Sequence, residues 1–247
     1  MKPAIKSEFR KLFTVRSTYI ITFFVIAFLL FIAFYVEGWR LKPGQLTDPH
    51  QLASDAYGGL TLMVFGAIVG ILSMTHEYRY NTIMYTLTST NRRSWVLISK
   101  IIVISAYAIG LAALLGTLSP LATYLGIHAH GHTLVPQMFY YKDLIWRTLF
   151  YGWSYGMFGL LIATIIRLQP GSVAALFVLP AVVEPLLTQL LGKNAVYLPF
   201  QALGQLVGDG SFGGGVLKPG RAALVFLVYL VVGWAVAWYL FLRRDAA

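Results

Sequence analysis

Six long apolar segments, separated by polar stretches, constrain this chain more than any other feature. A helix needs about 20 apolar residues to cross the roughly 30 Å hydrocarbon core of a bilayer. The segments cover residues 19–36, 58–75, 96–127, 148–166, 172–191 and 222–242. The sequence therefore predicts an all-α membrane protein, with six transmembrane helices in a single transmembrane domain over residues 1–247.

Composition agrees with a lipid environment. Of the 247 residues, 58% are hydrophobic and 11% are charged, whereas a soluble domain has about 25% charged residues. The chain has no cysteine, which excludes disulfides and thiolate metal sites. The net charge of +10 could suggest nucleic acid, but in a membrane protein an excess of basic residues usually marks the cytoplasmic loops. We expect a lipid bilayer around the chain and no nucleic-acid partner.

The basic residues are divided unevenly between the two sides. If the N-terminus is cytoplasmic, that side has twelve basic and three acidic residues, and the other side has seven basic and five acidic residues. Short cytoplasmic loops carry the excess of lysine and arginine. We therefore expect both termini, and the connector over residues 76–95, to face the cytoplasm.

The residues before the first span predict an amphipathic helix over residues 1–17. Ile5, Phe9, Leu12 and Phe13 recur at helical spacing, while lysines occupy other faces. Such a helix lies in the membrane interface with its apolar face in lipid. It could act as a general anchor or make a specific contact, and the sequence leaves both open.

The connector over residues 76–95 is polar and mostly basic. Its pattern predicts a helix from Glu77 to Leu87, with Tyr78, Thr82 and Tyr85 on one side, followed by a turn over residues 88–91. A hairpin between two spans needs only a short polar turn, so this connector is a long solvated loop or a docking surface. Tyrosines at helical spacing favour the docking surface, because tyrosine is enriched at protein interfaces.

Three stretches resemble one family. They are EYRxxTI followed by TL and RRxxxxxxK (residues 77–100), EFxKLxTxRS (8–17) and YLPFQAL (197–203). Together with the six-helix layout, they resemble the ABC-2 type permease subunits of bacterial ABC transporters. Members of that family often have glycine at the position of Asn81 and proline at that of Asn91, so the chain departs from the pattern in its turns.

The resemblance implies the permease subunit of an ATP-driven exporter in the bacterial inner membrane. Two separate ATPase chains would bind ATP and Mg, and a second permease subunit, identical or paralogous, would complete the transporter. Residues 76–95 would be the coupling segment that sits in a groove of the ATPase. The implied coupling residues are Glu77, Tyr78, Arg79, Thr82, Tyr85, Arg92 and Arg93.

The family fold also implies a substrate path between the two permease subunits, lined by the second and fifth spans. Residues there include Thr61, Met63, Phe65 and Met74, then Phe177, Glu184 and Gln189. Few charges line this path, which favours a hydrophobic or amphipathic cargo such as a drug, peptide or lipid. Glu184 is the one acid within a span. It could serve the path or a proton step, or it could make a structural hydrogen bond beside Pro180 and Pro185.

The chain has no phosphate-binding loop of the form GxxxxGK[ST], so we expect no ATP site, no other cofactor and no catalytic residue in this chain. Residues 152–156 match the nucleophile motif GxSxG, yet they fall within a predicted helix, where Gly152 and Gly156 would allow close packing. An intramembrane serine hydrolase using Ser154 remains an alternative, as does a membrane anchor without transport.

His128, His130 and His132 alternate along the chain and would converge on a metal only in an extended segment. An external loop is the favoured interpretation, and we predict no metal site.

Overall fold

The computed structural model describes residues 2–40, 63–89, 93–132, 142–207 and 217–243. Across these ranges the regular secondary structure is entirely helical, which confirms the all-α prediction. Five helical segments are long and apolar enough to span a membrane, as expected for a multi-pass membrane protein: Arg16–Trp39, Arg93–Ala129, Ile145–Ile166, Gln169–Tyr197 and Pro219–Arg243. The second predicted span (58–75) is described only from Met63 onward.

The first half of the chain contains α1 (Lys2–Thr14), α2 (Arg16–Phe31), a π-helix (Ile32–Trp39), α4 (Met63–Arg79), α5 (Ile83–Ser89) and α6 (Arg93–Ala129). The second half contains α7 (Lys142–Ile166), α8 (Gln169–Val178), a π-helical segment (Leu179–Val183), α9 (Glu184–Leu191), a 3₁₀ segment (Gly192–Tyr197), α10 (Pro199–Gly204) and α11 (Pro219–Arg243).

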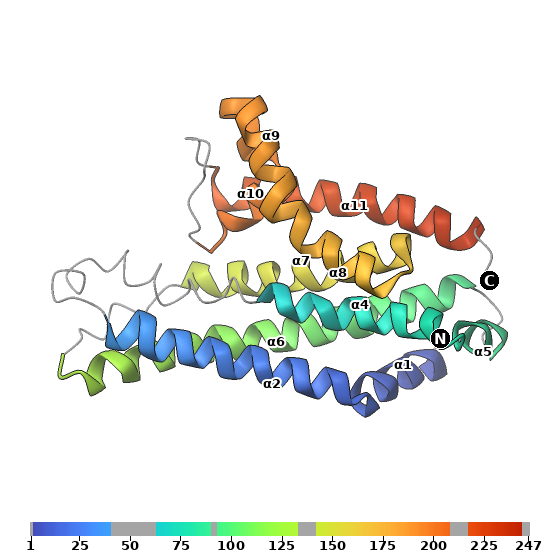
Figure 1. Cartoon of the computed structure of the whole chain (residues 1–247), viewed down its shortest axis with the longest axis horizontal. Helices are drawn as coiled ribbons and strands as arrows, with labels where there is room; N and C mark the ends of the chain where they lie inside the picture. The colour runs from blue at the N-terminus through green and yellow to red at the C-terminus, as the bar shows by residue number, and fades with distance from the viewer. Residues whose placement is uncertain (1, 41–62, 90–92, 133–141, 208–216, 244–247) are drawn as a thin grey trace.

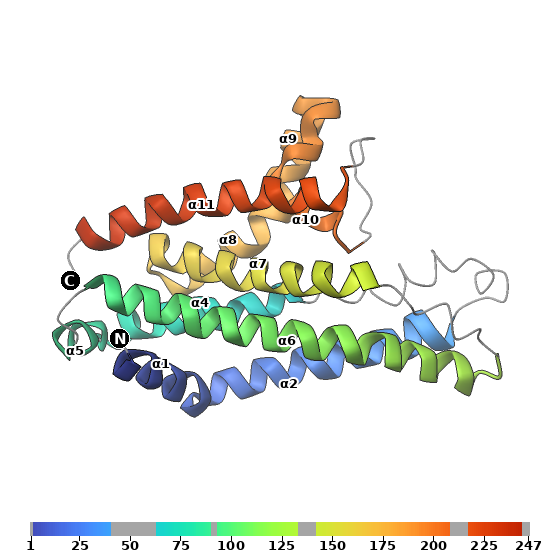
Figure 2. The same cartoon turned by 180° about the vertical axis from the view of Figure 1, so that it is seen from behind.

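The long helices lie side by side, and α7 contacts α4, α6 and α11 (Figures 1 and 2). The start of α1, the end of α11 and the whole of α5 lie at the same end of this bundle. That arrangement agrees with the predicted placement of both termini and the connector on one side. By contrast, α9 points away from the bundle axis.

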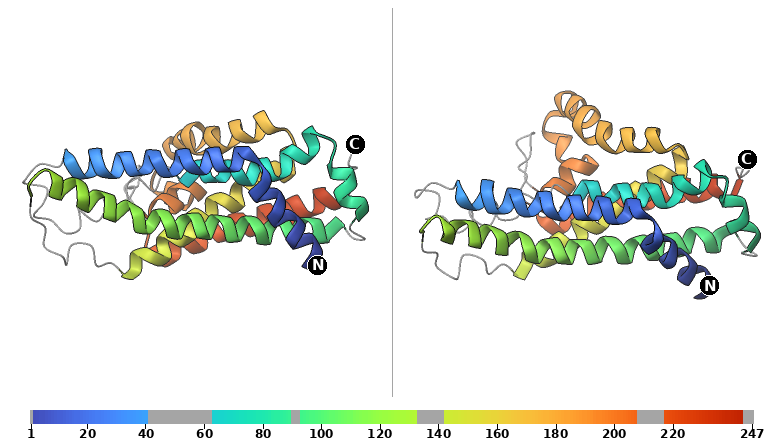
Figure 3. Two further views of the ribbon diagram at one scale, coloured as in Figure 1. Left: turned by 90° about the horizontal axis from the view of Figure 1, so that it is seen from below. Right: turned by 60° about the horizontal axis from the view of Figure 1, so that its bottom comes forward.

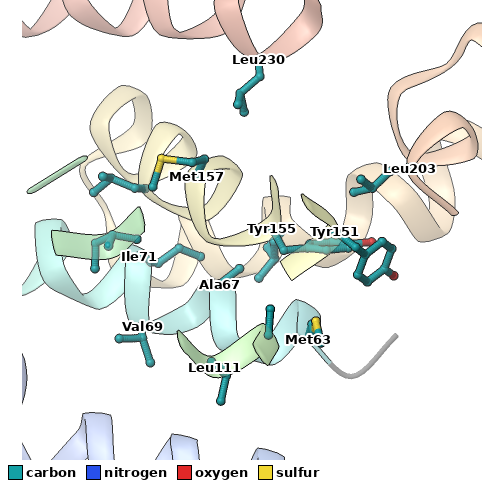
Figure 4. Close-up of a cluster of buried hydrophobic side chains, with 14 of the residues drawn as sticks. Met63, Ala67, Val69, Ile71, Leu111, Tyr151, Tyr155, Met157, Leu203 and Leu230 are labelled. Atoms are coloured by element: carbon teal, nitrogen blue, oxygen red, sulfur yellow. The ribbon is translucent and has the colours of Figure 1, made fainter. Parts of the chain in front are cut away.

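Small residues allow the close approach of α4, α6 and α7. A Cβ atom on Gly156 would lie 2.6 Å from the Cβ of Ala108, and one on Gly70 would lie 2.8 Å from the carbonyl oxygen of Gly156. These separations are shorter than two carbon-containing groups tolerate. The expected packing role of Gly156 is therefore visible in the structure, Gly70 packs equally closely, and larger side chains fill the rest of the cluster (Figure 4).

The outer faces of the bundle are apolar. Exposed large side chains are frequent on α2 and α11, among them Phe23, Phe24, Leu224 and Val231. A soluble monomer rarely exposes apolar patches of such extent, whereas a membrane helix places them against lipid tails.

The predicted single helix from Glu77 to Leu87 is wrong. The chain ends α4 at Arg79, turns through residues 80–82, and begins α5 at Ile83. Asn81 has φ +52°, a left-handed conformation that asparagine adopts more readily than most residues. This backbone also gives a physical reason for the glycine that the resembled family often has there.

The N-terminal helix is shorter than predicted and does more than lie in an interface. It ends at Thr14, where extended backbone at Val15 turns the chain into α2, and Figure 3 shows α1 lying across the direction of α2. Leu12 is buried, Phe9 and Phe13 are about half exposed, and α1 contacts α6. The helix therefore packs on the bundle through one part of its apolar face.

Candidate functional site

Four charged side chains meet where α1, α4 and α6 converge, and we call Glu8, Lys11, Glu77 and Lys100 the charged quartet. Lys100 Nζ lies 2.7 Å from Glu8 Oε2 and 2.8 Å from Glu77 Oε1. Lys11 Nζ lies 2.6 Å from Glu8 Oε1 and 2.8 Å from Glu77 Oε1. Each lysine thus contacts both carboxylates, and the formal charges sum to zero.

The quartet is buried to different depths. The side chain of Lys100 is 1% exposed and that of Glu77 is 8% exposed, whereas that of Lys11 is 40% exposed. Burial by itself would raise the pKa of Glu77, but Lys100 and Lys11 outweigh it and hold that pKa below its ordinary value. For Lys11, burial lowers the pKa and the two carboxylates more than compensate, so the net shift is upward. These shifts favour the ionised forms of both groups.

Lysines of the quartet also contact α5 of the connector and the backbone of α4. Lys11 Nζ donates to Thr86 Oγ1 of α5 at 3.2 Å, and Lys100 Nζ donates to the Ser73 carbonyl of α4 at 2.9 Å. Ile83, the first residue of α5, is buried. Consequently the hydrogen bond from Lys11 to Thr86 holds α5 to α1, and α5 also contacts α6.

Glu77, an implied coupling residue, pairs in the structure with Lys11 of the N-terminal helix and with Lys100 of α6. A signal for the pairing of Lys100 was present in the sequence, because Lys100 falls inside the predicted span 96–127 and an ionisable residue within a span calls for a partner.

The other predicted coupling residues separate into two groups. Arg79, Thr82, Tyr85 and Arg93 are exposed, and Tyr85 is 77% exposed. Tyr78 turns the other way, with the Arg167 guanidinium 5.0 Å from its ring centre. The predicted common face of Tyr78, Thr82 and Tyr85 therefore does not form. Arg92 lies outside the described residues.

A basic groove lies beside this exposed surface, between the end of α4 and the start of α8. It encloses about 710 Å³, and its polar lining includes Tyr78, Arg79, Arg167 and Gln169. Arg79 donates to Gln169 Oε1 at 3.2 Å, and Leu168 at its edge is exposed. The groove therefore combines positive charge with an apolar edge at the end of the bundle that holds the termini.

The predicted path residues are scattered. Phe65 and Phe177 bring their ring centres to 5.6 Å across α4 and α8, and Gln189 is exposed on α9. Met63 and Met74 are buried in the core, so their expected place on a path surface is wrong for this chain. Thr61 lies outside the described residues.

Glu184 is buried and holds the start of α10. Its Oε1 accepts from the backbone N–H of Phe200 at 2.7 Å, and its Oε2 accepts from that of Gln201 at 2.9 Å. The first N–H groups of a helix have no partner within it, so a carboxylate there is stabilising. Both oxygens therefore make the structural hydrogen bonds that were one of the two alternatives for this residue.

Ser154 is fully buried in α7, and its Oγ has no hydrogen-bond partner among the described residues. A serine nucleophile needs a base within hydrogen-bond reach, and this geometry supplies none. His128 belongs to α6 and stacks near Tyr124, whereas the His130 ring lies between Trp39 and His132. In the described part of the chain no three metal-ligating side chains gather.

Comparison with protein-family models finds no match for this chain, and comparison with curated proteins finds none either.

Proposed function

We propose that the chain is the permease subunit of an ATP-driven ABC transporter of the ABC-2 type. The observation that carries the proposal is the construction of the connector. Its outer surface exposes Arg79, Tyr80 and Tyr85, while on its inner side Ile83 is buried and the charged quartet joins α1, α4 and α6. A solvated loop has no need of such a buried brace, whereas a surface that receives force from a partner does.

The quartet would carry that force. A partner that displaces α5 acts on Lys11 through Thr86, and Lys11 shares Glu77 with Lys100. Movement would therefore reach α1, α4 and α6 together rather than bend a single helix. Packed elements of this kind move as rigid bodies.

The partners follow from the proposal. Two ATPase chains would hold ATP and Mg, and a second permease subunit, identical or paralogous, would face this one across the path. The basic groove favours an acidic side chain on the ATPase surface. Both termini would be cytoplasmic in the bacterial inner membrane, and the paired rings of Phe65 and Phe177 favour a hydrophobic or amphipathic exported cargo such as a drug, peptide or lipid.

Photo-crosslinking in the native membrane tests the proposal. Tyr85→benzoylphenylalanine should capture a nucleotide-binding ATPase, identified by mass spectrometry of the crosslinked product. The matched control is Tyr197→benzoylphenylalanine, because Tyr197 is also an exposed tyrosine but precedes α10, far along the chain from the connector. Capture of a partner that binds no nucleotide would favour the membrane-anchor alternative and contradict the transporter.

Function is tested with the ATPase captured in this way. In vesicles, Arg79→Ala and Tyr85→Ala should reduce ATPase recruitment or the ATP turnover that cargo stimulates, because both side chains lie on the exposed surface. Arg221 is exposed and lies near the start of α11, at the end of that helix away from the C-terminus. Arg221→Ala should change neither ATPase recruitment nor ATP turnover. If all three variants behave like the parent chain, the connector does not couple to an ATPase.

A further inference from the structure

The basic groove between α4 and α8 carries positive charge that no acidic side chain of its lining offsets. Arg79 and Arg167 both line it, and among the described residues its lining contains no aspartate or glutamate. Arg79 is exposed and makes no ion pair with the described part of the chain. The nearest carboxylate along the chain, Glu77, is buried and already paired with Lys11 and Lys100. The groove therefore attracts an anion rather than a cation.

The groove also offers hydrogen-bond donors of the kind that phosphate accepts. A guanidinium has five N–H donors in a planar fork, and Arg79 uses one of them on Gln169 Oε1 at 3.2 Å. Because the Gln169 oxygen accepts this bond, the amide nitrogen of the same side chain can donate. The Arg167 guanidinium lies 5.0 Å from the ring centre of Tyr78, and the aromatic face holds it at the groove. Arginine forks bind phosphate oxygens two at a time, so the lining suits a phosphate group.

An exposed apolar stripe leads away from the groove along α8 and the segments that follow it. Its residues recur at every fourth position, which places them on one face of a helix, and they are Pro170, Ala174, Val178, Val182 and Leu186. Pro170 also lines the groove, so the polar and apolar surfaces are continuous. At about 1.5 Å per residue, the stripe from Pro170 to Val182 is about 18 Å long. One acyl chain spans half of the hydrocarbon core, about 15 Å, so the stripe is long enough to accompany it.

We propose that the basic groove binds the phosphate of an anionic phospholipid, with the headgroup on Arg79 and Arg167 and one acyl chain along the stripe. Basic pockets beside the ends of membrane helices suit anionic headgroups, and the stripe distinguishes a lipid from a free phosphate. The inference concerns the chain by itself and does not rest on the transporter proposal. Arg79 has donors enough for a phosphate and for an acidic side chain of a partner, so the two uses of its guanidinium are compatible.

The test uses the full chain in phosphatidylcholine nanodiscs that contain a trace of phosphatidylglycerol with a photoreactive diazirine in its acyl chain. We expect crosslinks on Ala174, Val178 or Val182, located by mass spectrometry of the labelled peptides. Phosphatidylcholine with the same diazirine should label these residues at least about fivefold less, because a basic side chain near an anionic headgroup contributes enough for that factor. Equal labelling by the two lipids would overturn the proposal and leave the groove to an acidic partner protein, and so would the absence of crosslinks on the stripe.

One pair of variants tests the charge of the groove. Arg167→Gln should reduce labelling by phosphatidylglycerol at least about fivefold. The matched control is Arg243→Gln, because Arg243 is exposed at the same end of the bundle and also lies over a tyrosine, 4.6 Å from the ring centre of Tyr239. This control should label like the parent chain. An equal loss in both variants would reveal only a general effect of surface charge, and it would refute the site, as would unchanged labelling of Arg167→Gln.

A second pair of variants leaves both arginines in place. Leu168 lines the groove and its side chain is 66% exposed, so replacing it leaves the core intact. Leu168→Glu puts a carboxylate beside the arginines, where it competes with the phosphate, and Leu168→Gln has the same size without the charge. Both variants should give a normal size-exclusion elution profile. Labelling of Leu168→Glu should be at least about fivefold weaker than that of Leu168→Gln, and equal labelling of the two would contradict a headgroup in the groove.

A competition experiment separates a lipid from a free phosphate. Unlabelled phosphatidylglycerol in the nanodisc should reduce labelling of the parent chain. Inorganic phosphate, added at constant ionic strength, should leave labelling unchanged, because it gains nothing from the apolar stripe. Displacement of the labelled lipid by inorganic phosphate would identify a site for a small anion and overturn the lipid as its occupant.

Discussion

Lys100→Met should destabilise the folded chain strongly. Methionine keeps the length and volume of lysine, so the change removes a charge rather than creating a cavity. Glu8 and Glu77 would then share only Lys11, which is partly exposed. Two carboxylates with one cation leave an uncompensated buried negative charge.

The size of the effect follows from burial. Removing one partner of a buried ion pair costs about 3–5 kcal/mol. For a domain of this size, 1 kcal/mol corresponds to about 2–4 °C in the melting temperature, so the expected decrease is roughly 6–20 °C. Lys11→Met should cost less than Lys100→Met, because solvent screens a side chain that is 40% exposed.

Thermal aggregation in detergent, followed by fluorescence-detected size-exclusion chromatography, measures this shift. Lys6→Met is the matched control: Lys6 belongs to the same helix as Lys11, is exposed, and makes no ion pair with the described residues. The double variant Lys100→Met with Glu77→Gln should lose less than the sum of the single variants, because Glu8 and Lys11 then remain as a neutral pair. Additive losses, or no loss in Lys100→Met, would refute the quartet as a unit.

Acid should act on the same unit. Since the folded-state pKa of Glu77 lies below its ordinary value, the stability that it contributes is present above the unfolded-state pKa of about 4.3. That stability is lost as the pH falls through the folded-state pKa. Melting curves of the parent chain between pH 6 and pH 3 should therefore show a steeper decrease than those of Glu77→Gln, and parallel curves would argue against the assignment.

Three further predictions concern the helices. Gly156→Leu should prevent normal assembly, because its Cβ alone would approach the Cβ of Ala108 to 2.6 Å. Gly110→Leu on α6 has open space around it and should give a normal size-exclusion elution profile. Similar elution profiles for the two variants would contradict the close packing. Ser154→Ala should leave stability equal or up to about 1–3 kcal/mol higher, since it removes a buried hydroxyl that lacks a partner; loss of function with normal folding would revive the hydrolase alternative. Thr88→Cys should react with a membrane-impermeant maleimide from the cytoplasm only, and Lys193→Cys should react from the opposite side only. The measurement needs no other substitution, because the chain has no cysteine. Labelling of both cysteines from one side would refute the topology.

Much of the helical architecture was predictable because apolar run length alone identifies membrane helices. The predicted span 96–127 corresponds to α6 (Arg93–Ala129), and the packing role of Gly156 followed from its spacing to Gly152. The break at Asn81 was missed because the polar pattern on both sides continues at helical spacing, although asparagine is one of the few residues that adopt left-handed backbone readily.

The charged quartet could not be assembled from spacing. Glu8 and Lys100 lie 92 positions apart, and a pattern along the chain contains no information on which distant cation a carboxylate meets. Lys100 could have been singled out as a charge inside a span, but its partners required the three-dimensional arrangement of α1, α4 and α6. The capping role of Glu184 was harder still, because its partners are backbone N–H groups, which every residue except proline carries.

The separation of Glu8 from Lys100 also sets an order of events during synthesis. At about 5–20 residues per second, Lys100 leaves the ribosome roughly 5–20 s after Glu8. Until Glu77 has been made, α1 has only its internal ion pair, Lys11 with Glu8 three positions away, and the ion pairs that Lys100 makes with Glu8 and Glu77 form later still. We therefore expect α1 to complete its docking only when the start of α6 arrives, because the charged quartet lacks Lys100 until then.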